Sequence, residues 1–239
     1  MLGTQKQLIS GPVGAIELAI DFPHSMALWR GIALVAHPHP LFGGSLDNKV
    51  AQTLARVFAQ LGYLCVRPNF RGVGKSEGQH DNGIGEQEDM LAVLAWMRKP
   101  STWIEMRSAQ INGATSPSVI NLLDQDVQFV STCPFILGGF SFGSYVLSHV
   151  AASLKMRGTS AQRLVLVGTP TSRWQVAQVP DDSLLIHGEK DDTIPLTSVL
   201  DWAAPQDLSV TVVPGADHFF HRKLHIIKRI IFSAWHSPA

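Results

Sequence analysis

A serine flanked by glycines, Gly139–Gly143 (GFSFG), matches the pattern G-x-S-x-G. A short apolar run precedes it and a helical pattern follows, so Ser141 would lie on a sharp strand-to-helix turn. Small residues two positions before and after the serine let the two backbones pass closely, which gives Gly139 and Gly143 a steric reason to be glycine. The helix that follows would direct its free N–H groups toward developing negative charge. The motif predicts a nucleophile at Ser141.

A serine nucleophile needs a base, and the base needs an acid to orient it. Carboxylates follow the apolar run 184–186, and among them Asp191 is the candidate acid. His218 follows the last apolar run, 210–213, and is the candidate base. The chain order nucleophile, acid, base is one of the known orders for this triad. Since each residue follows a predicted parallel strand, we expect the three side chains to meet at one edge of a sheet.

The elements that must position these residues are short apolar runs that alternate with helical patterns. The runs carry no polar alternation, which is typical of strands buried on both faces of a parallel sheet. They are 31–36, 63–66, 135–137, 164–167, 184–186 and 210–213. Helices are predicted over 48–61, 86–99, 144–155 and 221–233.

This alternation predicts one α/β domain spanning residues 1–239, with a mostly parallel central sheet and helices on both faces. The opening segment 7–22 is expected to add one or two antiparallel edge strands. Residues 100–132 form a long connection with apolar content, and connections of that length are usually functional. This segment fits a lid or a contact with a second copy of the chain equally well, so a homodimer stays open.

Composition narrows the function classes. The 239 residues carry 19 Lys+Arg against 19 Asp+Glu, so no excess positive charge favours nucleic-acid binding. Two cysteines, Cys65 and Cys133, are too few for a disulfide framework and suit a reducing compartment. The N-terminus lacks the features of a signal peptide, and no apolar stretch reaches the ~18 residues of a membrane span. We expect a cytoplasmic protein with no membrane or nucleic-acid partner.

Two further segments carry the pattern of a known family: 37–44 (HPHPLFGG) and 69–78 (NFRGVGKSEG). Together with the serine turn and the acid and base loops, they make the chain resemble the small, cap-less α/β-hydrolases, close to the dienelactone-hydrolase-like bacterial esterases. The resemblance spans roughly residues 32–220 and implies the α/β-hydrolase fold. The family's acid loop reads H-G-x-x-D-x-x-[VI]-P, which assigns the acid to Asp191 and ranks Asp192 second.

The resemblance also implies that the HPHP loop supplies one oxyanion donor and that the N–H of Phe142 supplies the other. Pro38 and Pro40 have no N–H, so the loop donor is His39 or Leu41. Alignment with the H-G-x-P pattern of related hydrolases favours His39.

The expected function is a serine hydrolase that cleaves a small or medium carboxylic ester, or a thioester, through an acyl-enzyme, with no cofactor and no metal. The alternatives are a serine peptidase acting on short peptides and a non-catalytic binding module that keeps the hydrolase fold. The stretch 71–76 resembles the end of a phosphate-binding loop, but Asn69 replaces the leading glycine and no strong helix start follows. A turn beside the active site is the expected structure there.

Overall fold

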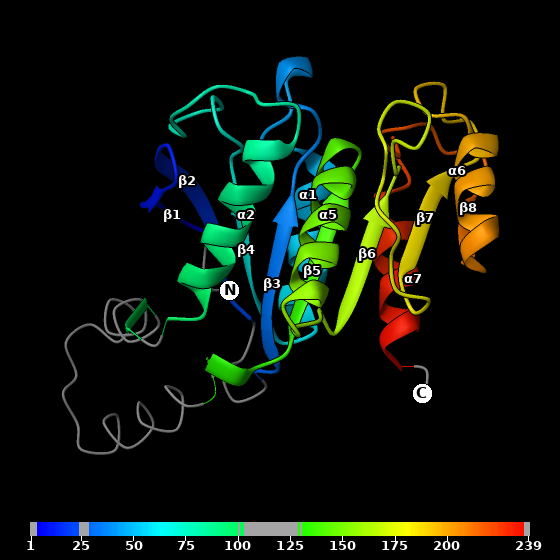
Figure 1. Ribbon diagram of the computed structural model, residues 1–239. Helices are drawn as coiled ribbons and strands as arrows, with labels where there is room; N and C mark the ends of the chain where they lie inside the picture. Colours follow the sequence, from blue (N-terminus) through cyan, green and yellow to red (C-terminus); the bar gives the residue numbers. More distant parts are fainter. Residues whose placement is uncertain (1–3, 24–28, 100, 103–128, 130, 237–239) are drawn as a thin grey trace.

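The structure is a computed structural model of the 239-residue chain. It describes residues 4–23, 29–99, 101–102, 129 and 131–236 (Figure 1). Most of the 100–132 connection, expected to act as a lid or an interface, lies outside the described residues. Its role stays a prediction.

All six predicted parallel strands are present. Within the described residues, eight strands form one sheet in the order β1-β2-β4-β3-β5-β6-β7-β8. The strands are β1 (Gln5–Gly11), β2 (Gly14–Asp21), β3 (Gly31–Ala36), β4 (Tyr63–Pro68), β5 (Phe135–Phe140), β6 (Arg163–Val167), β7 (Leu184–Gly188) and β8 (Val210–Val213). The first two strands pair antiparallel at one edge, as expected, and every pairing from β4 to β8 is parallel.

The helices are α1 (Lys49–Gln60), α2 (Ile84–Met97), α5 (Phe142–Met156), α6 (Leu196–Ala203) and α7 (Leu224–His236), with 3-10 turns η2 (Pro40–Phe42) and η3 (Ala204–Gln206). The sequence did not predict α6. Helix α1 begins where the Asn48 side chain accepts the N–H groups of Val50 and Ala51, and the chain leaves it through Gly62 at a φ of 94°. The apolar face predicted for this helix is buried.

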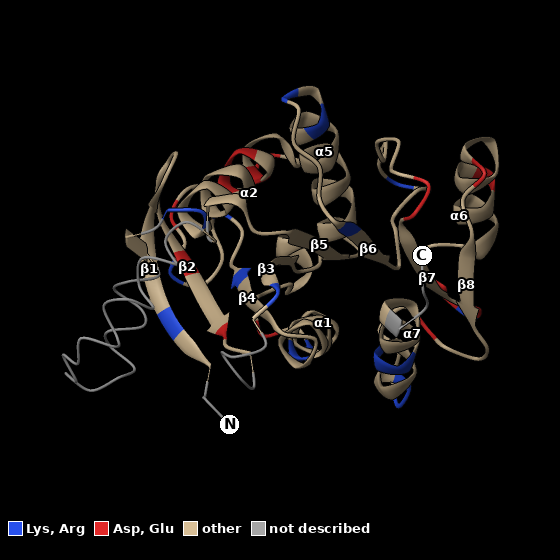
Figure 2. Cartoon of the chain, turned by 90° about the horizontal axis from the view of Figure 1, so that it is seen from below, with Lys and Arg blue, Asp and Glu red and all other residues tan. Residues whose placement is uncertain are grey.

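Helices cover both faces of the sheet (Figure 2). Helices α1 and α7 lie on one face, and α2, α5 and α6 lie on the other. Each face has its own apolar core: one contains residues of α2 and α5, and the other contains residues of α1 and α7. The central strands β3, β4 and β5 are buried along their whole length, which explains their lack of polar alternation.

The sheet topology fixes where a site can form. The chain runs from β3 outward to β4 and later returns to β5 on the other side of β3. At such a switch point the loops leaving two neighbouring parallel strands diverge and leave room for a ligand at their C-terminal ends. The loop after β3 begins with His37, and the turn after β5 holds Ser141, so two of the predicted functional segments flank this point.

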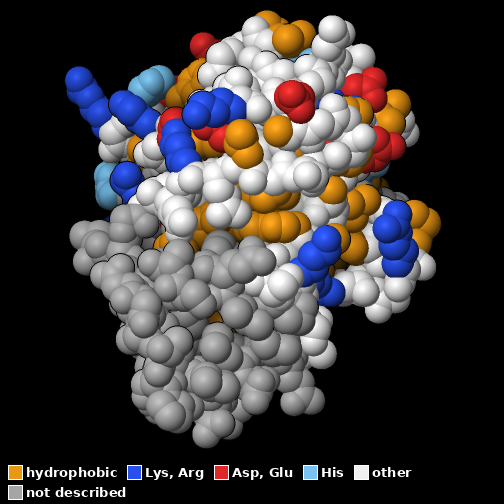
Figure 3. Space-filling view, turned by 90° about the vertical axis from the view of Figure 1, so that its left-hand side faces the viewer, with side chains coloured by type: hydrophobic (Ala, Val, Ile, Leu, Met, Phe, Trp, Pro, Cys, Tyr) orange, Lys and Arg blue, Asp and Glu red, His pale blue; other side chains and the backbone are white. Residues whose placement is uncertain are grey.

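Hydrophobic side chains form a band on the β1 side of the molecule (Figure 3). A groove there runs between β1 and α2, lined among others by Leu8, Ile9 and Trp96. None of the predicted site residues lines this groove. Within the described part of the chain, no helix has the length and apolar character needed to span a membrane.

Candidate active site

The turn after β5 holds Ser141 in a backbone conformation that side chains rarely adopt. Its φ is 52° and its ψ is −121°, and its N–H donates to the carbonyl of Val167 at 2.9 Å. A Cβ on Gly139 would lie 2.6 Å from the Cα of Ser144, and one on Gly143 would lie 2.4 Å from the carbonyl oxygen of Ala36. The predicted steric reason for both glycines is therefore present. Ser141 lies directly before α5, at the helix N-terminus.

Three side chains from three loops form one hydrogen-bonded chain. His218 Nδ1 lies 2.7 Å from Asp191 Oδ2, and His218 Nε2 lies 3.0 Å from Ser141 Oγ. A carboxylate can only accept, so Nδ1 carries the proton and Nε2 accepts the hydrogen of the serine hydroxyl. This is the arrangement in which an imidazole withdraws the proton of an attacking serine.

The loop after β7 holds Asp191 rigidly. Its Oδ1 accepts the N–H groups of Thr193 at 3.0 Å and Ile194 at 2.8 Å, so both carboxylate oxygens are occupied. His187 lies behind it: Nε2 donates to the carbonyl of Ile194 at 3.0 Å and is 3.5 Å from Asp191 Oδ2. Burial lowers the pKa of His187, which keeps this imidazole neutral.

Asp192, the second-ranked acid, is exposed, whereas Asp191 is buried. The side-chain Oδ1 of Asp192 accepts a long hydrogen bond from the Thr193 hydroxyl at 3.4 Å. The two neighbouring carboxylates thus leave the loop in different environments, and Asp191 is the one that reaches His218.

Of the two backbone donors expected to hold an oxyanion, the N–H of Phe142 directly follows the serine, and the N–H of His39 belongs to the loop after β3. Within the described residues, no hydrogen-bond partner is found for the N–H of His39 or for that of Phe142. Their side chains lie together, with ring centroids 4.8 Å apart. The alternative donor, the N–H of Leu41, points to His39 Nδ1 at 3.3 Å, and the Leu41 residue is 70% exposed.

A buried histidine fixes the loop that carries His39. His37 Nδ1 donates to the carbonyl of Pro38 at 2.7 Å, and its Nε2 accepts the N–H of Phe70 at 3.0 Å. Burial lowers the pKa of His37 to about 4, so the ring is neutral and its two nitrogens have fixed roles. His37 therefore ties the loop after β3 to the end of β4.

Known proteins are similar to this chain over nearly its whole length. The chain is 32% identical to XC6422 of Xanthomonas campestris, described as an α/β serine hydrolase without a lid; the match covers 100% of this chain and 98% of that one, with a TM-score of 0.79. This chain belongs to the α/β serine hydrolases. An α/β serine hydrolase homologue from Coxiella burnetii is also 32% identical, covers 98% of both chains and has a TM-score of 0.76. An uncharacterized protein of Rickettsia prowazekii, RP471, is 28% identical over 235 residues.

A model of the X-Pro dipeptidyl-peptidase family S15 matches residues 31–115 of this hydrolase. That range contains the loop with His39 but ends before Ser141, Asp191 and His218. The match supports a hydrolase, and it does not include the three residues of the hydrogen-bonded chain.

The sequence did not reveal a second histidine–carboxylate pair in this hydrolase. His80 Nδ1 lies 2.7 Å from Glu86 Oε1, and the Glu86 side chain is fully buried. The centroid of the His80 ring is 4.8 Å from that of the His39 ring and 5.4 Å from that of the Phe142 ring. Nothing in the residue pattern marks these two residues as a pair.

The stretch compared above with a phosphate-binding loop is a turn that ties β4 to α2. Arg71 donates to both carboxylate oxygens of Asp89, at 2.8 and 2.9 Å. The Ser76 hydroxyl donates to the carbonyl of Asn69 at 2.8 Å. Helix α2 begins only at Ile84, so no helix N-terminus follows this turn directly.

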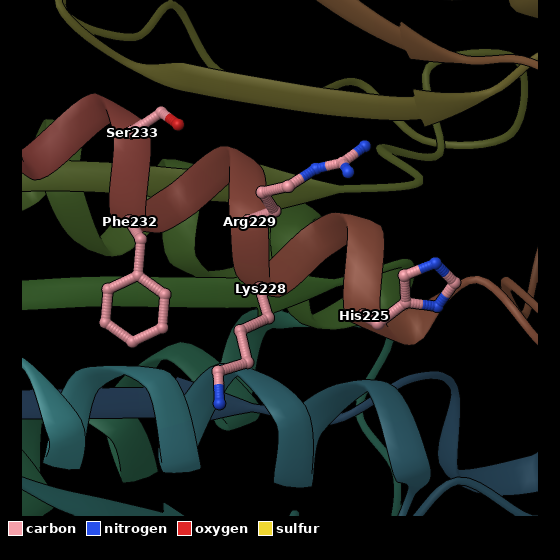
Figure 4. A pocket seen from close by; sticks show the side chains of 5 residues that line it. All are labelled: His225, Lys228, Arg229, Phe232 and Ser233. Carbon is pink, nitrogen blue, oxygen red and sulfur yellow. The ribbon is translucent and has the colours of Figure 1, made fainter.

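Among the described residues, no group of three or more His, Cys, Asp or Glu side chains could hold a metal ion. A shallow pocket on α7 is lined by His225, Lys228, Arg229, Phe232 and Ser233 (Figure 4). Lys228 and Arg229 extend in different directions from the helix and do not converge on a ligand. Burial raises the pKa of the Cys133 thiol to about 11 and holds the pKa of the Cys65 thiol well above its usual value, so both thiols stay protonated.

Proposed function

We propose that this α/β serine hydrolase cleaves small or medium carboxylic esters, including thioesters, through a covalent acyl-enzyme. The observation that carries the proposal is the hydrogen-bonded chain from Asp191 through His218 to Ser141, formed on a strained turn at a helix N-terminus. Such strain persists only where the surrounding structure enforces it, and it is concentrated at functional sites.

In the proposed mechanism, Ser141 Oγ attacks the carbonyl carbon while His218 Nε2 takes the hydroxyl proton. The oxyanion is held by the N–H groups of Phe142 and His39, each typically worth ~3 kcal/mol of transition-state stabilisation. His218 then gives its proton to the leaving alcohol or thiol. A water molecule, deprotonated by His218, hydrolyses the acyl-enzyme, and Asp191 stabilises the imidazolium in both steps.

The competing function is a peptidase that removes dipeptides from peptide N-termini, and the partial S15 match favours it. Such an enzyme needs a carboxylate to hold the substrate ammonium group. Glu86 is a buried carboxylate whose partner His80 packs on His39, and it already accepts from His80, from the N–H of Asp81 at 3.0 Å and from the N–H of Gly83 at 2.8 Å. Its occupied oxygens favour the esterase.

The test compares three substrate classes with the same protein: p-nitrophenyl esters of increasing acyl length, acyl thioesters, and X-Pro p-nitroanilides. We expect the best ester to exceed the best X-Pro anilide in kcat/KM by at least ~100-fold, and Ser141→Ala to lower ester hydrolysis by ~10³-fold or more. Preference for the anilide would make the protein a peptidase. Folded protein without activity on any class would support the non-catalytic binding module.

A further inference from the structure

The His80–Glu86 pair packs on Phe142, the residue after the serine, and has no part in the proposed proton transfer. Glu86 is at the third position of α2, and its Oε2 accepts the N–H of Gly83, which caps the helix. Its Oε1 faces His80 Nδ1 at 2.7 Å. Because this oxygen can only accept, it holds a His80 proton on Nδ1, and in the tautomer that carries only this proton Nε2 is an acceptor.

That nitrogen is accessible. His80 Nε2 has no hydrogen-bond partner among the described residues. It is also not fully buried, because it is absent from the buried side-chain atoms of these residues that lack a partner: Arg98 Nε, Ser183 Oγ and His187 Nδ1. The side chain of His80 is 10% exposed, while Glu86 beneath it is fully buried. A buried carboxylate therefore holds a histidine ring whose outer nitrogen can still accept a hydrogen bond from a bound molecule.

The His80 ring belongs to a group of packed aromatic rings that includes both residues of the proposed oxyanion donors. His80 contacts the rings of His39 and Phe142, the two residues whose N–H groups would hold the oxyanion. Trp174 lies 5.1 Å from Phe142 and 5.8 Å from His39, and Tyr145 stacks on Trp174 at 4.8 Å and 29°. His39, Tyr145 and Trp174 are only partly buried. Flat ring faces at this position favour a flat partner, because stacked or edge-on aromatic contacts add to simple burial.

We propose that His39, His80, Tyr145 and Trp174, packed on the buried ring of Phe142, form the acyl subsite, with His80 as its hydrogen-bond acceptor, and that the substrate is the ester of a planar acid bearing a hydroxyl group. The inference rests on the proposed esterase function. A carbonyl oxygen held by His39 and Phe142 places the substituents of the carbonyl carbon beside these rings. The hydroxyl of a planar acyl group would then donate to His80 Nε2.

Matched p-nitrophenyl esters test the two parts of this proposal in the wild-type protein. Benzoate and cyclohexanecarboxylate differ in planarity but share a six-membered ring. The 3- and 4-hydroxybenzoates differ from their methoxy analogues in the ability to donate. We expect kcat/KM to favour benzoate and, for at least one ring position, to favour hydroxyl over methoxy by ~10-fold, the size expected of one net hydrogen bond.

Variants assign the hydroxyl preference to His80. His80→Phe keeps a ring and removes the nitrogen, so the hydroxyl-to-methoxy ratio should fall to about 1. His80→Gln, whose amide N–H₂ still donates to Glu86, replaces it if the Phe variant does not fold and should likewise lower the ratio. His225→Gln, on α7, is the control and should leave the ratio unchanged.

A wild-type ratio near 1, or a ratio unaffected by either His80 variant, would overturn the subsite while acetate hydrolysis upheld the esterase. Equal rates on benzoate and cyclohexanecarboxylate would overturn the planar preference. Folded wild-type protein that hydrolyses none of the esters would instead reject the proposed function on which the subsite rests.

Discussion

Two histidines in this hydrolase are held in the same way by buried carboxylates. In both the His218–Asp191 pair and the His80–Glu86 pair, Nδ1 lies 2.7 Å from a carboxylate whose side chain is fully buried. The pairs differ at the other ring nitrogen. His218 Nε2 faces the hydroxyl of Ser141 at 3.0 Å, whereas His80 Nε2 has no partner among the described residues.

In both pairs the carboxylate sets the tautomer and the orientation of the histidine ring. The group that faces Nε2 then determines whether the histidine can take a proton or bind a ligand. Beside Ser141, the strained turn supplies a hydroxyl from which a proton can be taken. Beside His80, aromatic rings supply a surface on which a substrate can lie. The first pair is suited to catalysis and the second to binding.

The largest expected effect is the difference in kcat between variants of Asp191, which holds His218, and of its neighbour Asp192. Asp191→Asn should lower kcat for ester hydrolysis by ~10⁴-fold, because an amide can donate to Nδ1 and so favours the wrong tautomer of His218. Asp192→Asn, one residue on and exposed, should change kcat less than ~3-fold. Steady-state kinetics of ester hydrolysis by the two variants measures this difference in kcat. Equal losses would mean that the acid role is shared, against the geometry described here.

His37 is a buried histidine whose two ring nitrogens are held by backbone groups instead of a carboxylate. The pKa of His37 is lowered by burial from 6.5 to about 4. Between these values the unfolded chain binds a proton that the folded protein does not, so stability falls as pH drops from 6.5 to 4, by about 3 kcal/mol from this residue. Urea unfolding of wild type and His37→Gln across this range measures it. The variant should be less stable at pH 7 and show a shallower slope, and parallel slopes would contradict the assignment.

The second pair predicts a loss of stability without a loss of chemistry. Glu86→Leu removes the acceptor for three donors, on His80, Asp81 and Gly83, and should destabilise the fold by about 2 kcal/mol. Hydrolysis of p-nitrophenyl acetate by the folded fraction should fall less than ~5-fold. Glu88→Gln, exposed on the same helix, should change stability by less than about 0.5 kcal/mol. A loss of acetate hydrolysis as large as that of Asp191→Asn would give Glu86 a catalytic role.

The smallest effect is expected for a third pair, His221–Asp217, which has a distance of 2.6 Å but side chains that are 72% and 43% exposed. Solvent screens such a pair, so His221→Gln should change the free energy of unfolding by no more than about 0.5 kcal/mol. It should also leave ester hydrolysis unchanged. A large loss of either would mean that burial does not separate the three pairs.

Much of the fold could be predicted because its signals are local. The uninterrupted apolar runs of β3, β4 and β5 mark strands that are buried on both faces. At the site, Ser141 is marked by glycines that the close backbone packing requires, and the acid and base follow recognisable strands. These are relations between neighbours in the chain, and the residue pattern carries them directly.

The rest of the site depends on contacts that no period marks. His80 meets Glu86 six residues later only because the chain turns back through Asn82 and Gly83, both at positive φ. Trp174 lies in the connection between β6 and β7 and reaches the site by packing on Tyr145. The short helix α6 also went unpredicted. Tertiary packing places such residues, so they become visible only in the structure.

The central claim is that Ser141 is an activated nucleophile, and labelling with a fluorophosphonate probe tests it most directly. We predict a single adduct on the peptide containing Ser141, read by mass spectrometry, with no adduct in Ser141→Ala and a labelling rate at least ~10³-fold lower in His218→Ala. Folded wild-type protein that takes up no probe, or label that persists unchanged in Ser141→Ala, would contradict the account.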